Sequence, residues 1–147
     1  MKITAKSRYA LRMLVDMAVH GNGGTRTIRE ISESQGLSEK FIGRIAISLK
    51  RAGLLVTARG VKGGLALALF PEKITLLDIV TATDGPLALV HCLARPGACA
   101  MHGRCAAEKA WSGVNDALAS HLKSVTLASV AAEARAMASS GEQDYCI

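Results

Sequence analysis

The sequence predicts a mainly α-helical fold with one small β-hairpin. Half of the 147 residues are hydrophobic, most of them aliphatic, whereas only 3% are aromatic. Several segments place apolar residues at the three-and-four spacing of an amphipathic helix, and one pair of short segments alternates as strands do. These observations favour close-packed aliphatic helices over a β-sandwich.

Two helices are expected near the N-terminus. The first begins after Thr4, a suitable N-cap, and extends to about His20, where the sequence GNGG follows. The second, TIREISESQG (27–36), opens with Thr27 and Glu30 at the spacing of a capping box.

A third helix follows a tight turn that contains Gly36. The segment LSEKFIGRIAISLKRAG (37–53) has Ser38 as its N-cap candidate and is more basic than the helix before it. Two short helices separated by a glycine-containing turn are typical of a helix-turn-helix, in which the second helix enters the major groove of DNA.

A β-hairpin is predicted directly after the third helix. LLVTARG (54–60) and GLALALF (64–70) are short apolar segments on either side of RGVKGG. A basic, glycine-rich hairpin after a helix-turn-helix predicts a winged helix, whose wing tip can place arginine in a minor groove. The alternative is a solvated turn in which glycine serves geometry only. The residues of the tip are Arg59, Gly60, Lys62, Gly63 and Gly64.

The positive charge is concentrated in the N-terminal half. Residues 1–65 contain twelve Lys or Arg and four Asp or Glu, a balance of +8, whereas residues 66–147 contain six and eight, a balance of −2. This asymmetry favours a polyanion as partner, nucleic acid before membrane, with a solvated basic face as the alternative. Because neither a membrane span nor a signal peptide is evident, a cytoplasmic protein without membrane contact is expected.

Three further helices are expected after the hairpin. One covers about 75–83, a long one covers 106–123, and the last follows Thr126. The long helix carries one apolar stripe, which packs either on the chain's own body or against the same helix of a second chain to form a dimer. The stripe consists of Trp111, Val114, Leu118, Leu122 and Val125.

The stretch CLARPGACAMHGRC (92–105) holds three cysteines with six and five residues between them. A zinc site usually starts from closely spaced cysteine pairs, which are missing here, whereas an iron–sulfur cluster needs thiolates and accepts a histidine. A cluster, a zinc site, a thiol sensor and incidental cysteines all remain open from spacing alone. The residues concerned are Cys92, Cys99 and Cys105, with His91, His102 and Glu108 nearby.

Longer motifs place the chain beside a known family. These motifs are MKITAKSRYALRML, ISESQGLSEKFIGRI, KRAGLLVTARGVKGGLALA and the cysteine triad followed by TLASV. Over nearly its whole length the chain resembles the winged-helix iron–sulfur transcription regulators of the IscR, NsrR, RirA and CymR family, and its opening ITAKSRYA resembles the IscR branch. The resemblance implies a homodimer that binds double-stranded operator DNA and is not an enzyme. The absence of G-x-S-x-G, H-E-x-x-H and phosphate-cradling motifs agrees with this.

The resemblance also implies roles for individual residues. Cys92, Cys99 and Cys105 match the cluster ligands of the family's cluster-binding members. The exposed start of the recognition helix and the wing match the DNA-binding positions, which are Ser38, Glu39, Lys40, Arg44, Arg59, Gly60, Lys62, Gly63 and Gly64.

Two departures from the IscR pattern affect the metal site. The first cysteine gap is six residues rather than five, and Glu108 stands where IscR-type proteins have their histidine ligand. Glu108, His102 and His91 are therefore all candidates for a fourth ligand, and the cluster type, 2Fe–2S or 4Fe–4S, is left open.

The expected organisation has three parts. Residues 1–85 form a winged helix-turn-helix domain, residues 86–108 a cysteine-rich cluster-binding loop, and residues 106–140 the dimerisation and C-terminal helices. The functional hypothesis is a transcription regulator whose operator binding is modulated by an iron–sulfur cluster. The alternatives are a CymR-like repressor that senses thiol state or binds a partner without a cluster and, from another class, an iron–sulfur carrier or storage protein.

Overall fold

The computed structural model describes residues 3–21, 23–58, 63–95, 97 and 99–139. Within these residues the chain is mainly helical with one two-stranded antiparallel sheet, which confirms the predicted fold class. The elements in chain order are α1 (Ala5–His20), α2 (Ile28–Gln35), α3 (Glu39–Arg51), β1 (Leu55–Ala58), β2 (Gly64–Leu67), the 3-10 helix η1 (Pro71–Lys73), α4 (Leu76–Asp84), α5 (His91–Ala94), α6 (Ala106–Ser124) and α7 (Leu127–Ser139).

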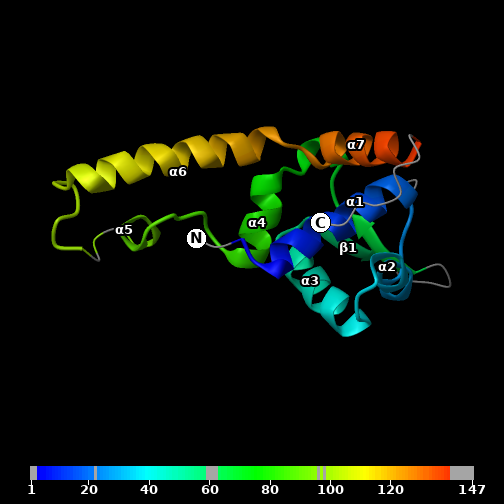
Figure 1. The fold of residues 1–147 in the computed structure, drawn as a ribbon. Coiled ribbons are helices and arrows are strands. Elements are labelled where there is room, and N and C mark those ends of the chain that lie inside the picture. Colours follow the sequence, from blue (N-terminus) through cyan, green and yellow to red (C-terminus); the bar gives the residue numbers. More distant parts are fainter. Residues whose placement is uncertain (1–2, 22, 59–62, 96, 98, 140–147) are drawn as a thin grey trace.

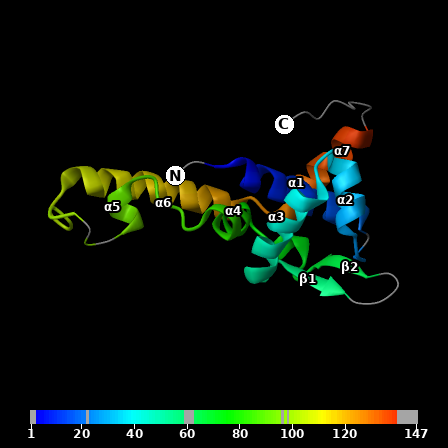
Figure 2. The same cartoon turned by 90° about the horizontal axis from the view of Figure 1, so that it is seen from below.

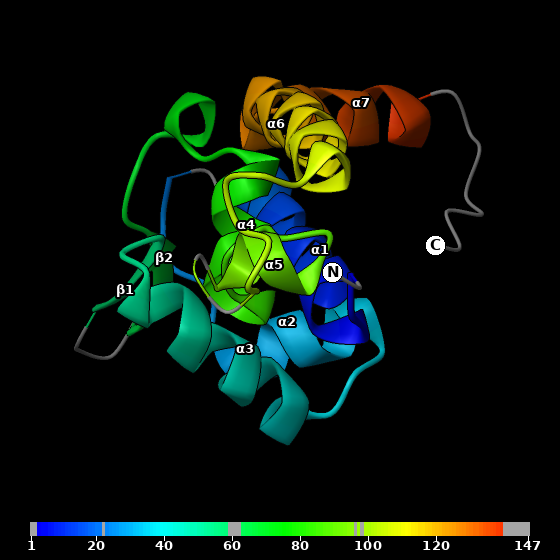
Figure 3. The ribbon, with the colours of Figure 1, turned by 90° about the vertical axis from the view of Figure 1, so that its left-hand side faces the viewer.

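Helix α1 lies at the centre of the molecule. It packs against α2, α3, α4, α7 and β2. Helices α6 and α7 follow one another along one side, and α3 and the hairpin lie on the opposite side (Figures 1 and 3). The outer part of α6 extends beyond the body, with α5 beside its outer end (Figures 1 and 2). Helices α3 and α5 are therefore well separated within one chain (Figures 1 and 2).

The core is aliphatic and gathers around α1. Met13 and Leu14 of α1 are fully buried, as are Ile31 of α2 and Ile42 and Ile45 of α3. These residues recur at the three-and-four spacing of a helix, so each helix presents one apolar face to its neighbours. Full burial of such a side chain contributes roughly 1.5 to 3 kcal/mol, which makes this cluster the main support of the fold.

Local caps start the helices where the sequence predicts. The Thr4 hydroxyl accepts a hydrogen bond from Lys6 N, and the Ser38 hydroxyl accepts one from Phe41 N. Thr27 and Glu30 form the expected capping box, in which each side chain binds the other residue's backbone amide. The caps confirm three predicted helix starts, and each satisfies an amide that a helix N-terminus leaves without a partner.

The hairpin is real but shorter than the two apolar segments. Leu55 pairs with Leu67 and Ala58 with Gly64 in an antiparallel register. The strand pattern does not continue to Leu69, which lies beyond β2 and is 46% exposed. The hairpin packs on α3 and α1, next to the helix-turn-helix (Figure 2).

The junction of α6 and α7 is attached to the body by the backbone. Leu76 N donates to Val125 O at 2.9 Å, and Leu127 N donates to Ile74 O at 2.8 Å. The predicted cap at Thr126 is confirmed, since its hydroxyl accepts from Ser129 N at 3.2 Å. The end of α6 is therefore hydrogen-bonded to Leu76, the first residue of α4.

Asp84, at the end of α4, ties that helix to the start of α1. Its carboxylate accepts hydrogen bonds from Thr4 N at 2.9 Å, from the Thr4 hydroxyl at 2.6 Å and from the Ser7 hydroxyl at 2.6 Å. Burial favours a raised pKa for Asp84, but the hydrogen bonds from Ser7 and Thr4 outweigh it and hold the pKa below its ordinary value of 3.8.

The part of the chain that the structure describes includes no helix with the length and apolar composition that membrane crossing requires.

We expect Asp84→Asn to reduce the acid dependence of stability. Because the folded protein lowers the pKa of Asp84, the stabilisation is present above the ordinary pKa of 3.8 and is lost as the pH falls below it. The variant should lose about 1 kcal/mol of the free energy of unfolding at neutral pH and show a shallower further loss on acidification. Denaturant unfolding at several pH values measures both quantities. Asp116→Asn, at an exposed position of α6, is the control, and identical acid profiles for wild type and Asp84→Asn would contradict this account.

Candidate functional site

Helix α3 divides cleanly into a buried face and a charged face. Ile42, Ile45 and Leu49 are fully buried against the body. The side chains on the other face are exposed, namely Glu39, Lys40, Arg44, Lys50 and Arg51. Four cations and one carboxylate on the exposed face suit contact with a phosphate backbone and base edges.

An exposed isoleucine lies within this charged face. Ile47 is 53% exposed and follows Lys40 and Arg44 at helical spacing, so the three side chains share one stripe. An arginine in a major groove can bind guanine through two hydrogen bonds, and an apolar side chain can contact a thymine methyl group. Sequence reasoning missed Ile47, although its position outside the buried spacing of α3 is a visible signal.

The first predicted DNA-binding residue, Ser38, has a structural role as well. Its hydroxyl caps α3 by accepting from Phe41 N at 3.3 Å, and its side chain is exposed. The hydroxyl hydrogen is still available to an acceptor such as a phosphate oxygen. Ser38 therefore fits both the cap and the interface.

The base of the predicted wing includes the start of strand β2, which the structure describes from Gly63 onward. Gly64 pairs with Ala58, and Gly63 directly precedes it. A Cβ atom added at Gly64 would lie 2.8 Å from the carbonyl oxygen of Arg26, so the close approach of these two backbones requires glycine. The other predicted wing residues, Arg59, Gly60 and Lys62, lie outside the described residues.

The cysteine segment is not wholly a loop, and that part of the prediction is wrong. His91 to Ala94 form the short helix α5, which packs against α6 and carries the half-buried Cys92. Cys99 is exposed, and the half-buried Cys105 immediately precedes α6. Gly103, between these two, has φ 75°, a conformation that favours glycine and turns the chain into α6.

Two candidates for a fourth ligand bind each other. His102 Nδ1 lies 2.6 Å from Glu108 Oε1, and the other carboxylate oxygen of Glu108 accepts from Gly103 N at 3.0 Å. The Glu108 side chain is only 15% exposed, against 44% for His102. The Glu108 carboxylate thereby closes the turn before α6. The third candidate, His91, is exposed at the start of α5.

The thiols are not gathered around one point in this structure. Among the described residues, no group of three or more Cys, His, Asp or Glu side chains is placed to hold a metal ion. A cavity of about 540 Å³ at the start of α6 is lined by Cys105, Glu108 and Leu93, among others, but not by Cys92 or Cys99. The donor set fits an iron–sulfur cluster by chemistry, because three free thiols lie in one short segment. Closing around a cluster would require the segment to rearrange.

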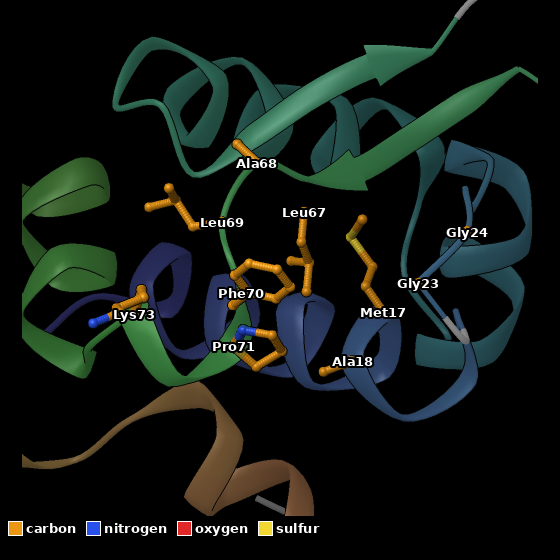
Figure 4. Close-up of a pocket in the computed structure, with 10 residues that line it drawn as sticks. All are labelled: Met17, Ala18, Gly23, Gly24, Leu67, Ala68, Leu69, Phe70, Pro71 and Lys73. Carbon is orange, nitrogen blue, oxygen red and sulfur yellow. The ribbon is translucent and has the colours of Figure 1, made fainter.

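A separate pocket of about 480 Å³ lies beside the base of the hairpin (Figure 4). Met17, Leu67 and Phe70 line it, and the close-up shows their side chains grouped at its centre. Lys73 is the one charged residue among its ten described lining residues. The pocket offers few polar groups to orient a ligand, and we assign it no role.

Comparisons with known proteins agree with this arrangement. Residues 3–133 match the model of the Rrf2 family, described as iron-dependent transcriptional regulators. The chain is 32% identical over 127 residues to the HTH-type transcriptional regulator IscR of Aliivibrio salmonicida, covering 86% of this chain and 75% of the relative. It is 28% identical over 144 residues to IscR of Photorhabdus laumondii, covering 98% and 87%.

Solved structures show the same likeness. CymR, the global cysteine regulator of B. subtilis, superposes with a TM-score of 0.74 at 28% identity, over 90% of this chain and 98% of CymR. IscR of T. potens superposes with a TM-score of 0.69 at 28% identity, over 91% and 88%. With its helix-turn-helix, its hairpin and these relatives, the chain belongs to the Rrf2 family on the IscR branch and is a DNA-binding transcription regulator rather than an enzyme.

Proposed function

We propose that this regulator binds operator DNA as a homodimer in the cytoplasm, and that an iron–sulfur cluster held by Cys92, Cys99 and Cys105 modulates the binding. One observation carries the proposal. The thiol segment leads through Cys105 straight into α6, and the other end of α6 is bonded to the winged-helix body. A change at the thiols therefore has a continuous helix through which to reach the DNA-binding elements.

The recognition helix supplies the DNA contacts in this proposal. Arg44 is exposed near the middle of α3, where it can reach a base edge, and Lys40 lies one turn earlier, where it can reach a phosphate. In the wing, Arg59 and Lys62 add minor-groove and phosphate contacts. The +8 balance of residues 1–65 supports this assignment, since phosphate neutralisation provides much of the affinity for DNA.

The chemistry of the thiols supports the cluster. When bound, the cluster supplies sensitivity to iron, oxygen or redox state. The three thiols would hold it, and either Glu108 or His102 would have to leave the bond between them to become the fourth ligand. If Glu108 is the residue that leaves, it also gives up the hydrogen bond from Gly103 N that closes the turn, and the first turn of α6 is affected with it.

The dimer follows from the exposed stripe of α6. Trp111 and Val114 are 48% and 52% exposed, although they continue the same helix face as the half-buried Leu118 and the buried Leu122. Both residues belong to the N-terminal half of α6 (Ala106–Ser124), and this half of the helix extends beyond the body (Figure 1). A two-fold dimer through this stripe would cover it and present two copies of α3 to two half-sites.

This proposal divides the chain by role. Residues 1–85 bind DNA, residues 86–108 hold the cluster, and residues 106–140 form the dimer and return the chain to α1. Within residues 106–140, helix α7 returns the chain to the body by packing on α1 and η1.

A cluster-free, thiol-sensing repressor is the second candidate. It is favoured by the exposure of Cys99, which leaves a free thiol open to oxidants, and by the structural likeness to CymR. Membership of a regulator family gives no support to the third possibility, an iron–sulfur carrier.

Arg44→Ala should weaken specific DNA binding by about 1 to 3 kcal/mol, because it removes a base-edge contact. The probe is a duplex that the wild-type protein selects from a random-sequence library, and a fluorescence titration measures affinity. Lys123→Ala is the control, since Lys123 is exposed and belongs to α6, a helix that lies on the far side of the body from α3 (Figure 3). Equal losses in the two variants would argue against α3 as the reading element.

Val114→Glu should convert the dimer into monomers. Val114 is exposed in the single chain, so the substitution leaves the fold intact, but a dimer would bury the new carboxylate without a partner at a cost of several kcal/mol. Sedimentation velocity measures the association state. Ser120→Glu, on the opposite face of α6, should remain dimeric, and a dimeric Val114→Glu would place the interface elsewhere.

Each of Cys92→Ala, Cys99→Ala and Cys105→Ala should abolish or greatly destabilise the cluster, since three thiolates are already fewer than the usual four ligands. Anaerobic purification followed by iron and sulfide analysis and visible absorbance measures this. The control is Cys146→Ala, at the fourth cysteine of the sequence, which is far from residues 92–105 in the chain; this variant should keep a full cluster.

The same measurement assigns the fourth ligand. A changed spectrum in Glu108→Ala alone indicates carboxylate ligation, and one in His102→Ala alone indicates histidine. Full iron and sulfide in all three single cysteine variants would reject the cluster. Colourless wild-type protein whose DNA binding responds to oxidation would support the thiol sensor.

A further inference from the structure

A buried carboxylate in α1 has no part in the functions described above. Asp16 is 4% exposed and lies in the helix at the centre of the fold. Its Oδ2 atom is 3.0 Å from Arg26 Nη2, and its Oδ1 atom accepts from the Ser34 hydroxyl at 3.0 Å. His20 Nδ1 lies 3.2 Å from Oδ1 at the more exposed side. The carboxylate thus joins α1 to the segment before α2 and to α2 itself.

The pairing of Asp16 with Arg26 is not optimised for stability. The 3.0 Å contact brings the charges together, but Asp16 Oδ2 and Arg26 Nε are both buried and make no hydrogen bond of good geometry. Desolvating two charges costs much of what their attraction returns, so well-packed apolar residues would often serve stability as well. We therefore interpret the ion pair as holding Arg26 in a defined position relative to α1.

The backbone of Arg26 shows what is positioned. Arg26 N donates to Leu65 O and Leu65 N donates to Arg26 O, both at 2.8 Å, so Arg26 forms a β-bridge with the returning strand of the wing. The absent side chain of Gly64 permits this approach. The next residue, Thr27, caps α2. One residue thus joins α1 through its side chain and the wing through its backbone, at the point where the helix-turn-helix begins.

We propose that the Asp16–Arg26 pair positions the wing relative to α3 and so sets the geometry in which the protein reads its operator. Both are positioning residues and not DNA contacts, because their side chains are only 3% and 19% exposed. The inference rests on the proposed contact of the wing with DNA. Loss of the pair would remove the connection from α1 to β2 through Arg26 and leave only the direct packing of β2 on α1, while α3 keeps its own core contacts through Ile42 and Ile45.

The test replaces the charged pair by a neutral one. Arg26→Met alone leaves a buried carboxylate without its cation and can unfold the protein, whereas the Asp16→Asn, Arg26→Met double variant removes both charges. Arg26→Lys keeps the charge and should retain more of the wild-type behaviour. Gly64→Ala disturbs the backbone contact between Arg26 and β2 but leaves the ion pair intact. It provides a second test if the double variant does not fold. Circular dichroism and thermal unfolding establish the folded fraction before binding is measured.

The probe is the duplex selected by the wild-type protein, and three readouts are combined. In the double variant we expect an affinity at least about tenfold lower, a salt dependence shallower by about one unit for each wing cation lost, and loss of hydroxyl-radical protection in the minor groove. Protection of guanine N7 from methylation, which reports α3 in the major groove, should remain. Unchanged affinity and footprint, or equal loss in both grooves with an unchanged salt slope, would overturn the proposal.

A wing-tip variant separates this inference from the function on which it rests. If Arg59→Ala, Lys62→Ala leaves the minor-groove footprint unchanged, the wing does not contact DNA and the proposed interface is wrong. If that variant abolishes the footprint but the double variant of Asp16 and Arg26 does not, the interface stands and the positioning role alone is rejected.

Discussion

The burial of α1 is the constraint on which the rest of the structure depends. Its apolar face, which includes the fully buried Met13 and Leu14, contacts the helix-turn-helix, the hairpin, α4 and α7 at once. Because a protein interior is packed as densely as an organic crystal, one of these neighbours cannot shift without moving α1 or opening a void. Hydrogen bonds and an ion pair fix the orientation of α1 within this packing. Asp84 fixes the start of α1 to the end of α4, and Asp16 fixes its later part to α2 and the base of the wing.

This arrangement gives a continuous path of contacts from the cysteine segment to α3, on which the proposed regulation depends. Within the described part of the cysteine segment, α5 packs on α6. At its far end α6 is bonded through Val125 and Leu127 to the segment that begins α4, and α4 packs on α1 and α3. A coupling free energy of about 1 to 3 kcal/mol is typical of allosteric regulators. It requires that the free-energy difference between two orientations of α6 change by that amount when the thiols change state. The chain of contacts is continuous, so such a difference can reach α3.

The parts of the structure that could be predicted are those fixed by nearby residues. The caps at Thr4, Thr27 and Ser38 depend on partners within three residues, and the sequence therefore located three helices correctly. The same is true of the hairpin, whose two strands lie close together in the sequence and pair from Leu55 with Leu67 to Ala58 with Gly64. Pairings that depend on the tertiary fold were missed. Nothing in the helical pattern of α1 indicates that Asp16 meets Arg26. The sequence pattern also does not indicate the contact between His102 and Glu108, because that contact depends on how the turn before α6 folds.

The two incomplete features of the single chain lie on the same piece of α6. Cys105 precedes the helix, and Trp111, the first exposed apolar residue of the stripe, follows six residues later, about 9 Å along the axis. The thiols lack a common centre among the described residues, and the stripe lacks a covering surface in the single chain. Because Cys105 and the start of the stripe lie close together along α6, a structural change at one of them is expected to affect the other. A rearrangement that moves Cys105 or Glu108 changes the turn before α6 and so the first turn of the helix, which borders the stripe. Cluster binding and dimer geometry are therefore expected to be linked by structure, with the outer end of α6 as the element they share.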